Sequence, residues 1–208
     1  MTFSAVLFDR DGTVIFDRHY LSDPDGVELI PGTGEALVRL GTAGIASYLV
    51  SNQSGIGRGY FPESGWYDCQ ARLDELLATY RAKLEDSRFC PHDPEDHCDC
   101  RKPGTGMWES LREAHGLEAS SCAMVGDKPE DLRFGINAGL AAAVLVLTGK
   151  GEKSAEKLGL DTGEIARAGF MPIPVENIPA EWLEGRSTPI QLFVASNTAA
   201  AVDGLMAL

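Results

Sequence analysis

Short apolar runs alternate with helical patterns over the first 150 residues, and this alternation constrains the fold more than any other feature. Four continuous runs suit strands buried on both faces: FSAVLF (3–8), IASYLV (45–50), SCAMV (121–125) and AAAVLVL (141–147). Helical spacing lies between them, for example in Ala36, Leu37 and Leu40. Strands that alternate with helices predict an α/β fold with a doubly wound parallel sheet.

Proline and glycine mark the expected helix ends. We expect one helix to begin near Pro62, a second to cover about 105–115 and stop at Gly116, and a third to run from Pro129 to Gly139. Beyond residue 150 the pattern weakens. The stretch GFMPIPVENIPAEWLEG reads as irregular chain over the core, and a short terminal helix capped by Asn197 is expected after it.

The net charge of −13 limits the partners. A nucleic-acid-binding surface needs clustered basic residues, and the totals disfavour both nucleic acid and anionic membranes as partners. The chain contains no apolar run of transmembrane length and no basic, apolar leader at its start, so we expect a cytoplasmic protein. The charge implies that any phosphate site must be built locally from a few cations.

Polar residues follow the ends of the predicted strands. Asp9 and Asp11 come after the first strand, Ser51 and Asn52 after the second, and Asp127 after the third. Parallel strands bring their carboxyl ends to one edge of the sheet, where such folds bind ligands. A single Asp-x-Asp is most often a turn, but matching groups at several strand ends predict one active crevice.

The ordered segments FDRDGT, SNQ, RKPG and GDKPED resemble the four motifs of the haloacid dehalogenase superfamily of phosphohydrolases, over about residues 3–150. The resemblance implies that Asp9 is the nucleophile that forms an aspartyl-phosphate and that Asp11 is the general acid/base. It also implies that Ser51 donates a hydrogen bond to the phosphoryl group and that Lys102 offsets its charge.

The same resemblance implies a Mg²⁺ cofactor. Its expected ligands are the carboxylates of Asp9 and Asp127 and the backbone carbonyl of Asp11, since Mg²⁺ prefers oxygen. Asp131 either supports that site or caps the following helix. Lys128 either faces the crevice, or points outward or pairs with Glu130.

Three cysteines and one histidine lie within eleven residues: Cys90, His92, Cys98 and Cys100. In a reducing compartment this cluster predicts metal ligands rather than disulfides. Four such donors fill the tetrahedron of a structural Zn²⁺ site, although His97 and His115 are competing ligands. The predicted zinc-binding loop covers residues 89–101.

The run CPH…CDCRKPGTGM, with SNQSGIGRGYF, resembles a subgroup of heptose 1,7-bisphosphate and histidinol-phosphate phosphatases. The resemblance implies hydrolysis of a phosphate monoester, of a small sugar bisphosphate at the 7-phosphate in the first case or of histidinol phosphate in the second. Phosphoryl transfer to another sugar and a non-catalytic phosphate-binding scaffold are competing functions for the same residues.

Four residues are candidates for substrate binding. Arg58 and Arg101 are predicted to bind a second anionic group, because guanidinium forms bidentate contacts with phosphate. The alternative for each is a solvated surface arginine. Asn52 and Gln53 either bind sugar hydroxyls or order their own loop. Loops 17–30, 53–61 and 90–104 are expected to surround an open crevice, since no insert is long enough for a large cap domain.

These expectations divide the chain into a haloacid dehalogenase-like phosphatase domain over residues 1–169 and a C-terminal extension over residues 170–208 of unknown role. The sequence leaves the choice between monomer and homodimer open.

Overall fold

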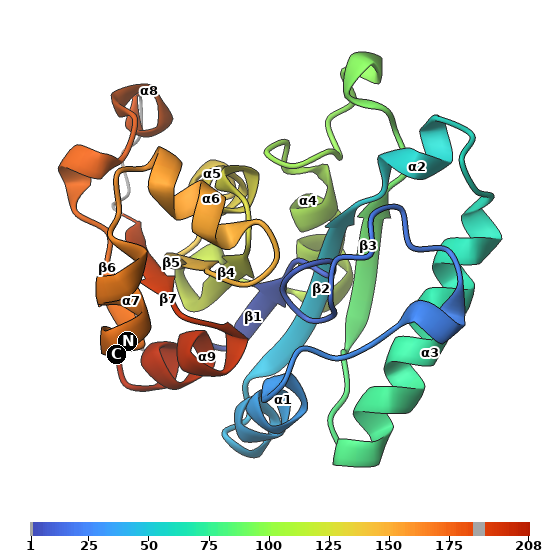
Figure 1. The fold of residues 1–208 in the computed structure, drawn as a ribbon, viewed down its shortest axis with the longest axis horizontal. Helices are drawn as coiled ribbons and strands as arrows, with labels where there is room; N and C mark the ends of the chain where they lie inside the picture. Colours follow the sequence, from blue (N-terminus) through green and yellow to red (C-terminus); the bar gives the residue numbers. More distant parts are fainter. Residues whose placement is uncertain (1, 185–189) are drawn as a thin grey trace.

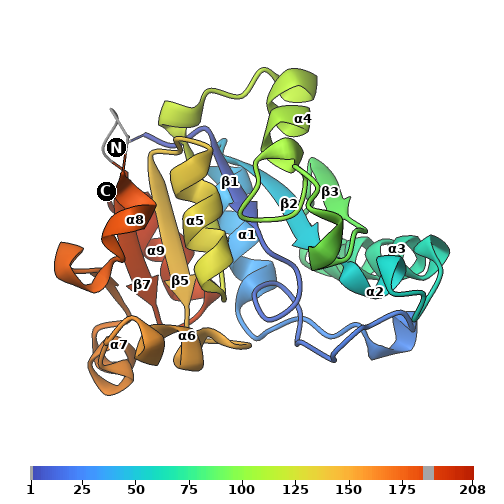
Figure 2. The ribbon, with the colours of Figure 1, turned by 90° about the horizontal axis from the view of Figure 1, so that it is seen from above.

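The computed structural model describes residues 2–184 and 190–208 and shows a seven-stranded sheet with helices on both faces (Figures 1 and 2). The strand order is β3-β2-β1-β4-β5-β7-β6, and among the strands of the described residues only β6 runs antiparallel to its neighbour. The predicted doubly wound α/β fold is therefore confirmed.

The strands have the following bounds: β1 Ala5–Phe8, β2 Ala46–Asn52, β3 Asp86–Cys90, β4 Cys122–Gly126, β5 Ala142–Val146, β6 Phe170–Pro172 and β7 Gln191–Ala195. The helices are α1 Thr33–Thr42, α2 Ser54–Gly57, α3 Glu63–Tyr80, α4 Gly106–His115, α5 Pro129–Asn137, α6 Gly151–Lys157, α7 Thr162–Ala168, α8 Ala180–Leu183 and α9 Thr198–Met206. The four predicted strands and the predicted helices are all present, with shifts of a few residues at their ends.

The first strand shows how the sheet divides the core. Val6 and Phe8 belong to a cluster with the inner faces of α1, α3 and α9, whereas Ala5 and Leu7 belong to one with α4, α5, α6 and α7. Side chains alternate between the faces of a strand, so a continuous apolar run supplies both cores. Each face of the sheet is thereby covered by helices.

The predicted topology was incomplete between residues 53 and 101. Residues 53–101 were expected to form one helix and the zinc loop, but β3 also lies there, at the edge of the sheet beside β2. Its residues DSRFC are mostly only half-buried, so the strand lacks the apolar pattern of the central strands. The helix α3 packs on the sheet through Cys69, Leu73 and Leu77 rather than forming a separate cap.

The C-terminal segment completes the sheet. β7 pairs in parallel with β5, and β6 pairs with β7, so this segment is more regular than the expected irregular chain. The predicted terminal helix is confirmed, since the Asn197 side chain accepts a hydrogen bond from the Ala200 amide at the start of α9. The division at residue 169 stays a prediction.

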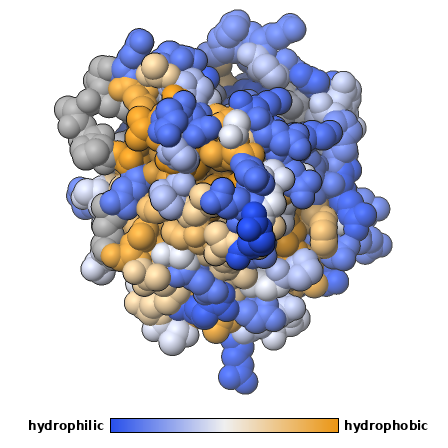
Figure 3. All heavy atoms as spheres, turned by 60° about the vertical axis from the view of Figure 1, so that its left-hand side comes forward, coloured by the Kyte–Doolittle hydropathy of each residue, from blue (hydrophilic) through white to orange (hydrophobic). Residues whose placement is uncertain are grey.

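The side of the molecule brought forward in Figure 3 carries hydrophobic atoms among hydrophilic ones. Val175, which lies between β6 and α8 in the C-terminal segment, is 73% exposed. Among the described residues, no helix is long and apolar enough to cross a membrane.

Candidate active site

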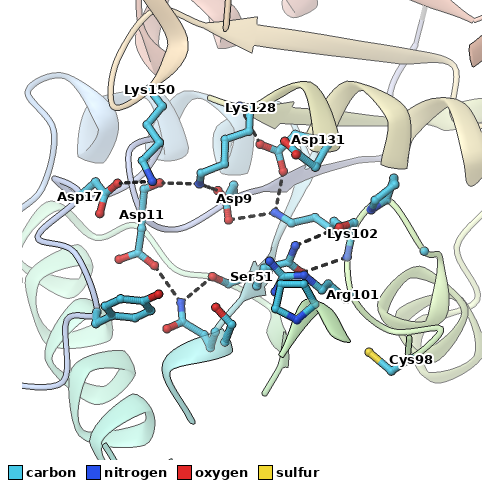
Figure 4. A pocket seen from close by; sticks show the side chains of 18 of the residues that line it. Asp9, Asp11, Asp17, Ser51, Cys98, Arg101, Lys102, Lys128, Asp131 and Lys150 are labelled. Carbon is cyan, nitrogen blue, oxygen red and sulfur yellow. Dashed lines mark hydrogen bonds and ion pairs between the residues drawn. The ribbon is translucent and has the colours of Figure 1, made fainter. Parts of the chain in front are cut away.

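The predicted crevice lies at the carboxyl ends of the strands. A cavity of about 740 Å³ opens there, between residues that follow β1, β2 and β4 and the loop that precedes α4. The candidate catalytic and substrate-binding residues that line it are Asp9, Asp11, Ser51, Asn52, Gln53, Arg101 and Lys102. The topology therefore brings together groups that are far apart in the chain (Figure 4).

Asp9 lies on the floor of the cavity between two lysines. Its carboxylate is 2.9 Å from Lys102 Nζ through Oδ1 and 3.0 Å from Lys128 Nζ through Oδ2 (Figure 4). Burial by itself would raise the pKa of Asp9, but the two ammonium groups outweigh it and hold the pKa well below its usual range. Asp9 is therefore an ionised carboxylate, which is the form a nucleophile needs.

Lys102 is almost completely buried, and its ammonium group contacts three oxygen atoms. Its ammonium lies 2.8 Å from the Val50 carbonyl and 2.6 Å from Asp131 Oδ1, in addition to Asp9. Burial opposes its charge, but Asp131 and Asp9 outweigh this and raise the pKa of Lys102. Asn52 holds the backbone of Lys102 from both sides, accepting its N–H at 2.9 Å and donating to its carbonyl at 3.1 Å.

Lys128 points into the site and does not pair with Glu130. Its Nζ is 3.0 Å from Asp127 Oδ1 and 3.5 Å from the Asp11 carbonyl, besides its contact with Asp9. Lys128 thus touches the three groups that the family resemblance assigns to Mg²⁺. Burial raises the pKa of Asp127 to about 7, although Lys128 acts in the opposite direction.

The acidic groups at this point fit a divalent cation. Oxygens of Asp9, Asp127 and Asp131 lie within 4.8 Å of one another, and such oxygens are the donors that Mg²⁺ prefers. Asp127 Oδ1 is buried and has no well-oriented hydrogen bond. Both oxygens of Asp131 are already used, one by Lys102 and the other by the Lys128 amide. Both oxygens of Asp9 likewise contact lysines, so Asp127 Oδ1 is the carboxylate oxygen of this group that is best placed for an ion.

Gly12 allows the chain to turn tightly beside Asp127. Its φ is +90°, and a Cβ there would come within 2.3 Å of Asp127 Oδ2. Both the backbone conformation and the close approach require glycine. This glycine, which follows the Asp-x-Asp pair, brings the Asp11 backbone close to the carboxylate after β4.

The Cys/His cluster fits a tetrahedral metal. Cys90 Sγ lies 3.5 Å from Cys98 Sγ, Cys100 Sγ lies 3.4 Å from Cys98 Sγ, and His92 Nδ1 lies 3.2 Å from Cys100 Sγ. A Zn–S bond of about 2.3 Å gives a tetrahedral edge of about 3.8 Å, close to these separations. The four ligand atoms are thus arranged around one point, and neither His97 nor His115 belongs to the group.

The sequence of the chain is similar to those of known phosphatases. The chain is 40% identical over 164 residues to the D-glycero-beta-D-manno-heptose-1,7-bisphosphate 7-phosphatase of Haemophilus ducreyi, covering 73% of this chain and 90% of the relative. The chain belongs to the haloacid dehalogenase-like (HAD-like) phosphatases. A HAD-hydrolase-like family model matches residues 99–166. The enzyme of the same name from Escherichia coli is 38% identical, covering 70% of this chain and 80% of that one.

A solved structure extends the likeness to the whole chain. The D,D-heptose 1,7-bisphosphate phosphatase of B. bronchiseptica, complexed with magnesium and phosphate, matches with a TM-score of 0.77 at 29% identity. The match covers 100% of this phosphatase and 99% of the other chain. The C-terminal segment is therefore included in the shared fold.

The four candidate substrate-binding residues differ in their surroundings. Arg101 lines the cavity, and its buried Nη1 has no hydrogen-bond partner. Arg58 lies outside the cavity lining, where it pairs with Asp93 and donates to Tyr20 Oη at 3.0 Å. The amides of Asn52 and Gln53 are engaged with neighbouring protein groups. The substrate-binding roles of all four stay predictions.

Three features of this phosphatase site lie beyond the sequence analysis. Lys150, in the turn after β5, lines the cavity, and its amide donates to Asp127 Oδ2 at 2.8 Å. Arg10 is completely buried and donates to both oxygens of Asp11. Tyr20 lines the cavity with φ of +60°. Lys150 could have been found from the sequence, because it follows the fourth predicted strand and parallel strands bring their carboxyl ends to one edge.

Proposed function

We propose that this chain is a Mg²⁺-dependent D-glycero-β-D-manno-heptose-1,7-bisphosphate 7-phosphatase. The observation that carries this proposal is the match to phosphatases of that name, which extends over 90% of the Haemophilus ducreyi relative. The buried lysine–aspartate network around Asp9 supports it, because that network is suited to an aspartyl-phosphate intermediate.

In the first half-reaction, an Asp9 carboxylate oxygen attacks phosphorus and the bond from phosphorus to the sugar oxygen breaks. Asp11 gives its proton to that leaving oxygen and becomes a carboxylate. Lys102 and Ser51 stabilise the charge on the phosphoryl oxygens. The sugar alcohol leaves, and the phosphoryl group remains on Asp9.

In the second half-reaction, the Asp11 carboxylate takes a proton from a water molecule as the water oxygen attacks phosphorus. The bond between Asp9 and phosphorus breaks, inorganic phosphate leaves, and Asp11 is again protonated. Both half-reactions therefore use the same side chain as acid and then as base. The starting protonation state is restored after each turnover.

The residues that would hold Mg²⁺ are Asp9 and Asp127 through carboxylates and Asp11 through its carbonyl. When bound, the ion supplies positive charge that offsets the anionic phosphoryl group. Lys128 contacts these same three groups in the structure, so it shares this role in neutralising charge. Its ammonium would lie near both the ion and the phosphate.

Cys90, His92, Cys98 and Cys100 would hold a structural Zn²⁺ with no open position for substrate. Two residues beyond the last of them, Lys102 enters the site. Arg101 supplies a guanidinium for a second anionic group of the substrate, which its unpartnered Nη1 supports. The cytoplasm remains the proposed location.

Kinetics on two substrates test this function. Steady-state kcat/KM would be measured with Mg²⁺ on the heptose 1,7-bisphosphate and on histidinol phosphate, with release of the 7-phosphate identified by NMR. We expect a preference of at least about tenfold for the bisphosphate, since a second phosphate engages Arg101. A higher kcat/KM on histidinol phosphate would replace the proposed substrate.

A matched variant checks the source of the preference. Arg101→Gln should lower kcat/KM more on the bisphosphate than on histidinol phosphate, because only the bisphosphate offers the second anion. Arg112→Gln, on the exposed side of α4, serves as the control. Equal losses on both substrates for Arg101→Gln would contradict recognition of a second phosphate at this residue.

A further inference from the structure

Gln53 occupies a buried position between two groups of the proposed catalytic site. It follows β2 directly and is 6% exposed. Its Nε2 lies 2.8 Å from Asp11 Oδ2 and 2.8 Å from Ser51 Oγ. Figure 4 draws dashed lines for contacts that leave Asp11 and Ser51.

The chemistry of the partners fixes the orientation of the amide. Asp11 Oδ2 already accepts from Arg10 Nε, so it faces the Gln53 amide as an acceptor, and the amide atom beside it is the nitrogen. That nitrogen has two hydrogens and two neighbours at hydrogen-bond distance. One N–H is therefore donated to Asp11 and the other to Ser51.

This arrangement determines what Ser51 can do. A hydroxyl has one proton to donate and two lone pairs that accept. Because the Gln53 N–H is donated to Ser51 Oγ, the serine acts as an acceptor on that side. Its own proton is left to be donated elsewhere, and Ser51 lines the cavity that would hold the phosphoryl group.

The same contact makes the two oxygens of Asp11 unequal. Oδ2 accepts from Gln53 at 2.8 Å and from Arg10 Nε at 3.1 Å, whereas Oδ1 accepts only the longer contact from Arg10 Nη2 at 3.3 Å. An oxygen that already accepts two hydrogen bonds is the poorer place for a proton. The acid form of Asp11 should therefore carry its proton on Oδ1.

We propose that Gln53 is a positioning residue for phosphoester cleavage: it fixes the proton of Asp11 on one oxygen and directs the Ser51 hydroxyl toward the phosphoryl group. This inference rests on the proposed function, in which Asp11 is the general acid. It assigns Gln53 to the reacting end of the substrate rather than to the sugar hydroxyls.

The leaving group provides a direct test. An aryl phosphate such as p-nitrophenyl phosphate leaves as a stable anion and needs little protonation, whereas a sugar alcohol needs the acid. General acid catalysis is worth about 10²–10⁴-fold. Gln53→Met should therefore lower kcat at least about tenfold more on the heptose bisphosphate than on p-nitrophenyl phosphate.

Gln53→Glu adds a pH readout. A carboxylate at this position faces Asp11, and two close carboxylates repel until one proton is shared between them. Once protonated, the introduced carboxyl group can donate one hydrogen bond, so the activity of the variant relative to wild type should rise as pH falls from about 8 to about 5. A constant ratio across this range would contradict the donor role of Gln53.

Gln70→Met is the matched control. Gln70 is similarly buried, at 7% exposed, and donates to an aspartate, Asp74, but it lies outside the cavity lining. We expect its kcat to change by the same factor on both substrates. Thermal unfolding of all variants separates loss of fold from loss of function.

Asp11→Asn separates the two levels of inference. If Asp11→Asn shows no greater loss on the sugar substrate, the acid role in the proposed function is wrong. If Asp11→Asn shows that loss but Gln53→Met does not, only the role of Gln53 is overturned. A rise in KM for the bisphosphate with unchanged kcat in Gln53→Met would instead identify a sugar ligand.

Discussion

The carboxylate of Asp9 is the group on which most of the proposed chemistry depends. Asp9→Asn keeps the shape of the side chain but removes the charge and the nucleophilic oxygen, so we expect kcat to fall at least about 10³-fold. Kinetics on the heptose bisphosphate would measure this. Circular dichroism and zinc content should match wild type. Substantial turnover in Asp9→Asn would refute the nucleophile assignment.

The raised pKa of Asp127 predicts that the stability of the protein depends on pH. Burial raises its pKa from 3.8 to about 7, so the folded, magnesium-free protein binds a proton in this range that the unfolded chain does not. The free energy of unfolding should therefore receive a contribution that is full below about pH 4 and lost as pH rises through about 7. Denaturant unfolding of zinc-loaded protein in magnesium-free buffer would measure it.

Asp127→Asn is the reference for that measurement, since the amide does not titrate. The difference in unfolding free energy between wild type and variant should shift in favour of the variant as pH rises from about 4 to about 7. A difference that is independent of pH would contradict the raised pKa. Magnesium should also bind more tightly at higher pH, since it competes with this proton.

At the scale of elements, the predicted zinc-binding loop links β3 to Lys102, the proposed catalytic lysine. Cys98→Ser should lose zinc and lower kcat, because the loop that precedes Lys102 would no longer be held, whereas magnesium affinity should be preserved. A colorimetric zinc assay, steady-state kinetics and magnesium titration would measure these effects. Cys69→Ser, at a buried cysteine outside the cluster, is the control. Loss of zinc with wild-type kinetics would contradict the positioning role of the loop.

The elements also show what the sequence could predict. The strands β1, β2, β4 and β5 were predictable because central parallel strands are apolar on both faces. β3 was missed because an edge strand buries less. β6 was missed because it is short and ends in Pro172, and β7 was missed because its pairing with β5 depends on contacts between distant parts of the chain.

The site also has parts that the sequence could predict and parts that it could not. Convergence of Asp9, Ser51 and Asp127 was predictable, because topology alone brings strand ends together. The contact between Gln53 and Asp11, and the three contacts of Lys128, were not, since they depend on side-chain directions that spacing does not specify. Arg58 illustrates the limit: its contacts with Asp93 and Tyr20 could not be read from the sequence, and its role in substrate binding stays a prediction.

At the scale of the whole molecule, α9 joins the two ends of the chain. The Thr198 hydroxyl donates to the Thr13 carbonyl at 2.6 Å, and Leu205 is buried in the core that includes α1. Leu205→Ala should lower the free energy of unfolding by about 2–5 kcal/mol through loss of packing. Met206→Ala, at a neighbouring exposed position, should change it by less than about 0.5 kcal/mol.

Chemical denaturation would compare these two variants, with kinetics at low temperature as a second readout. We expect KM to be unchanged in both, because α9 does not line the cavity. Equal stability of Leu205→Ala and Met206→Ala would show that the helix contributes little to the core. A changed KM would instead show that α9 influences the crevice through Thr13 and the loop after β1.

Cys90 is the last residue of β3 and also belongs to the Cys/His cluster. Its carbonyl accepts a hydrogen bond from the backbone N–H of Gln53 at 2.7 Å. The sulfur and the carbonyl of one residue therefore join the zinc cluster to the backbone of the residue that contacts Asp11. Opening of this edge of the sheet would expose the backbone N–H of Gln53 to hydrogen exchange, and bound zinc should slow that exchange. A zinc ion that takes part in no bond-breaking step would thus govern how long Asp11, the proposed general acid, keeps its contact with Gln53.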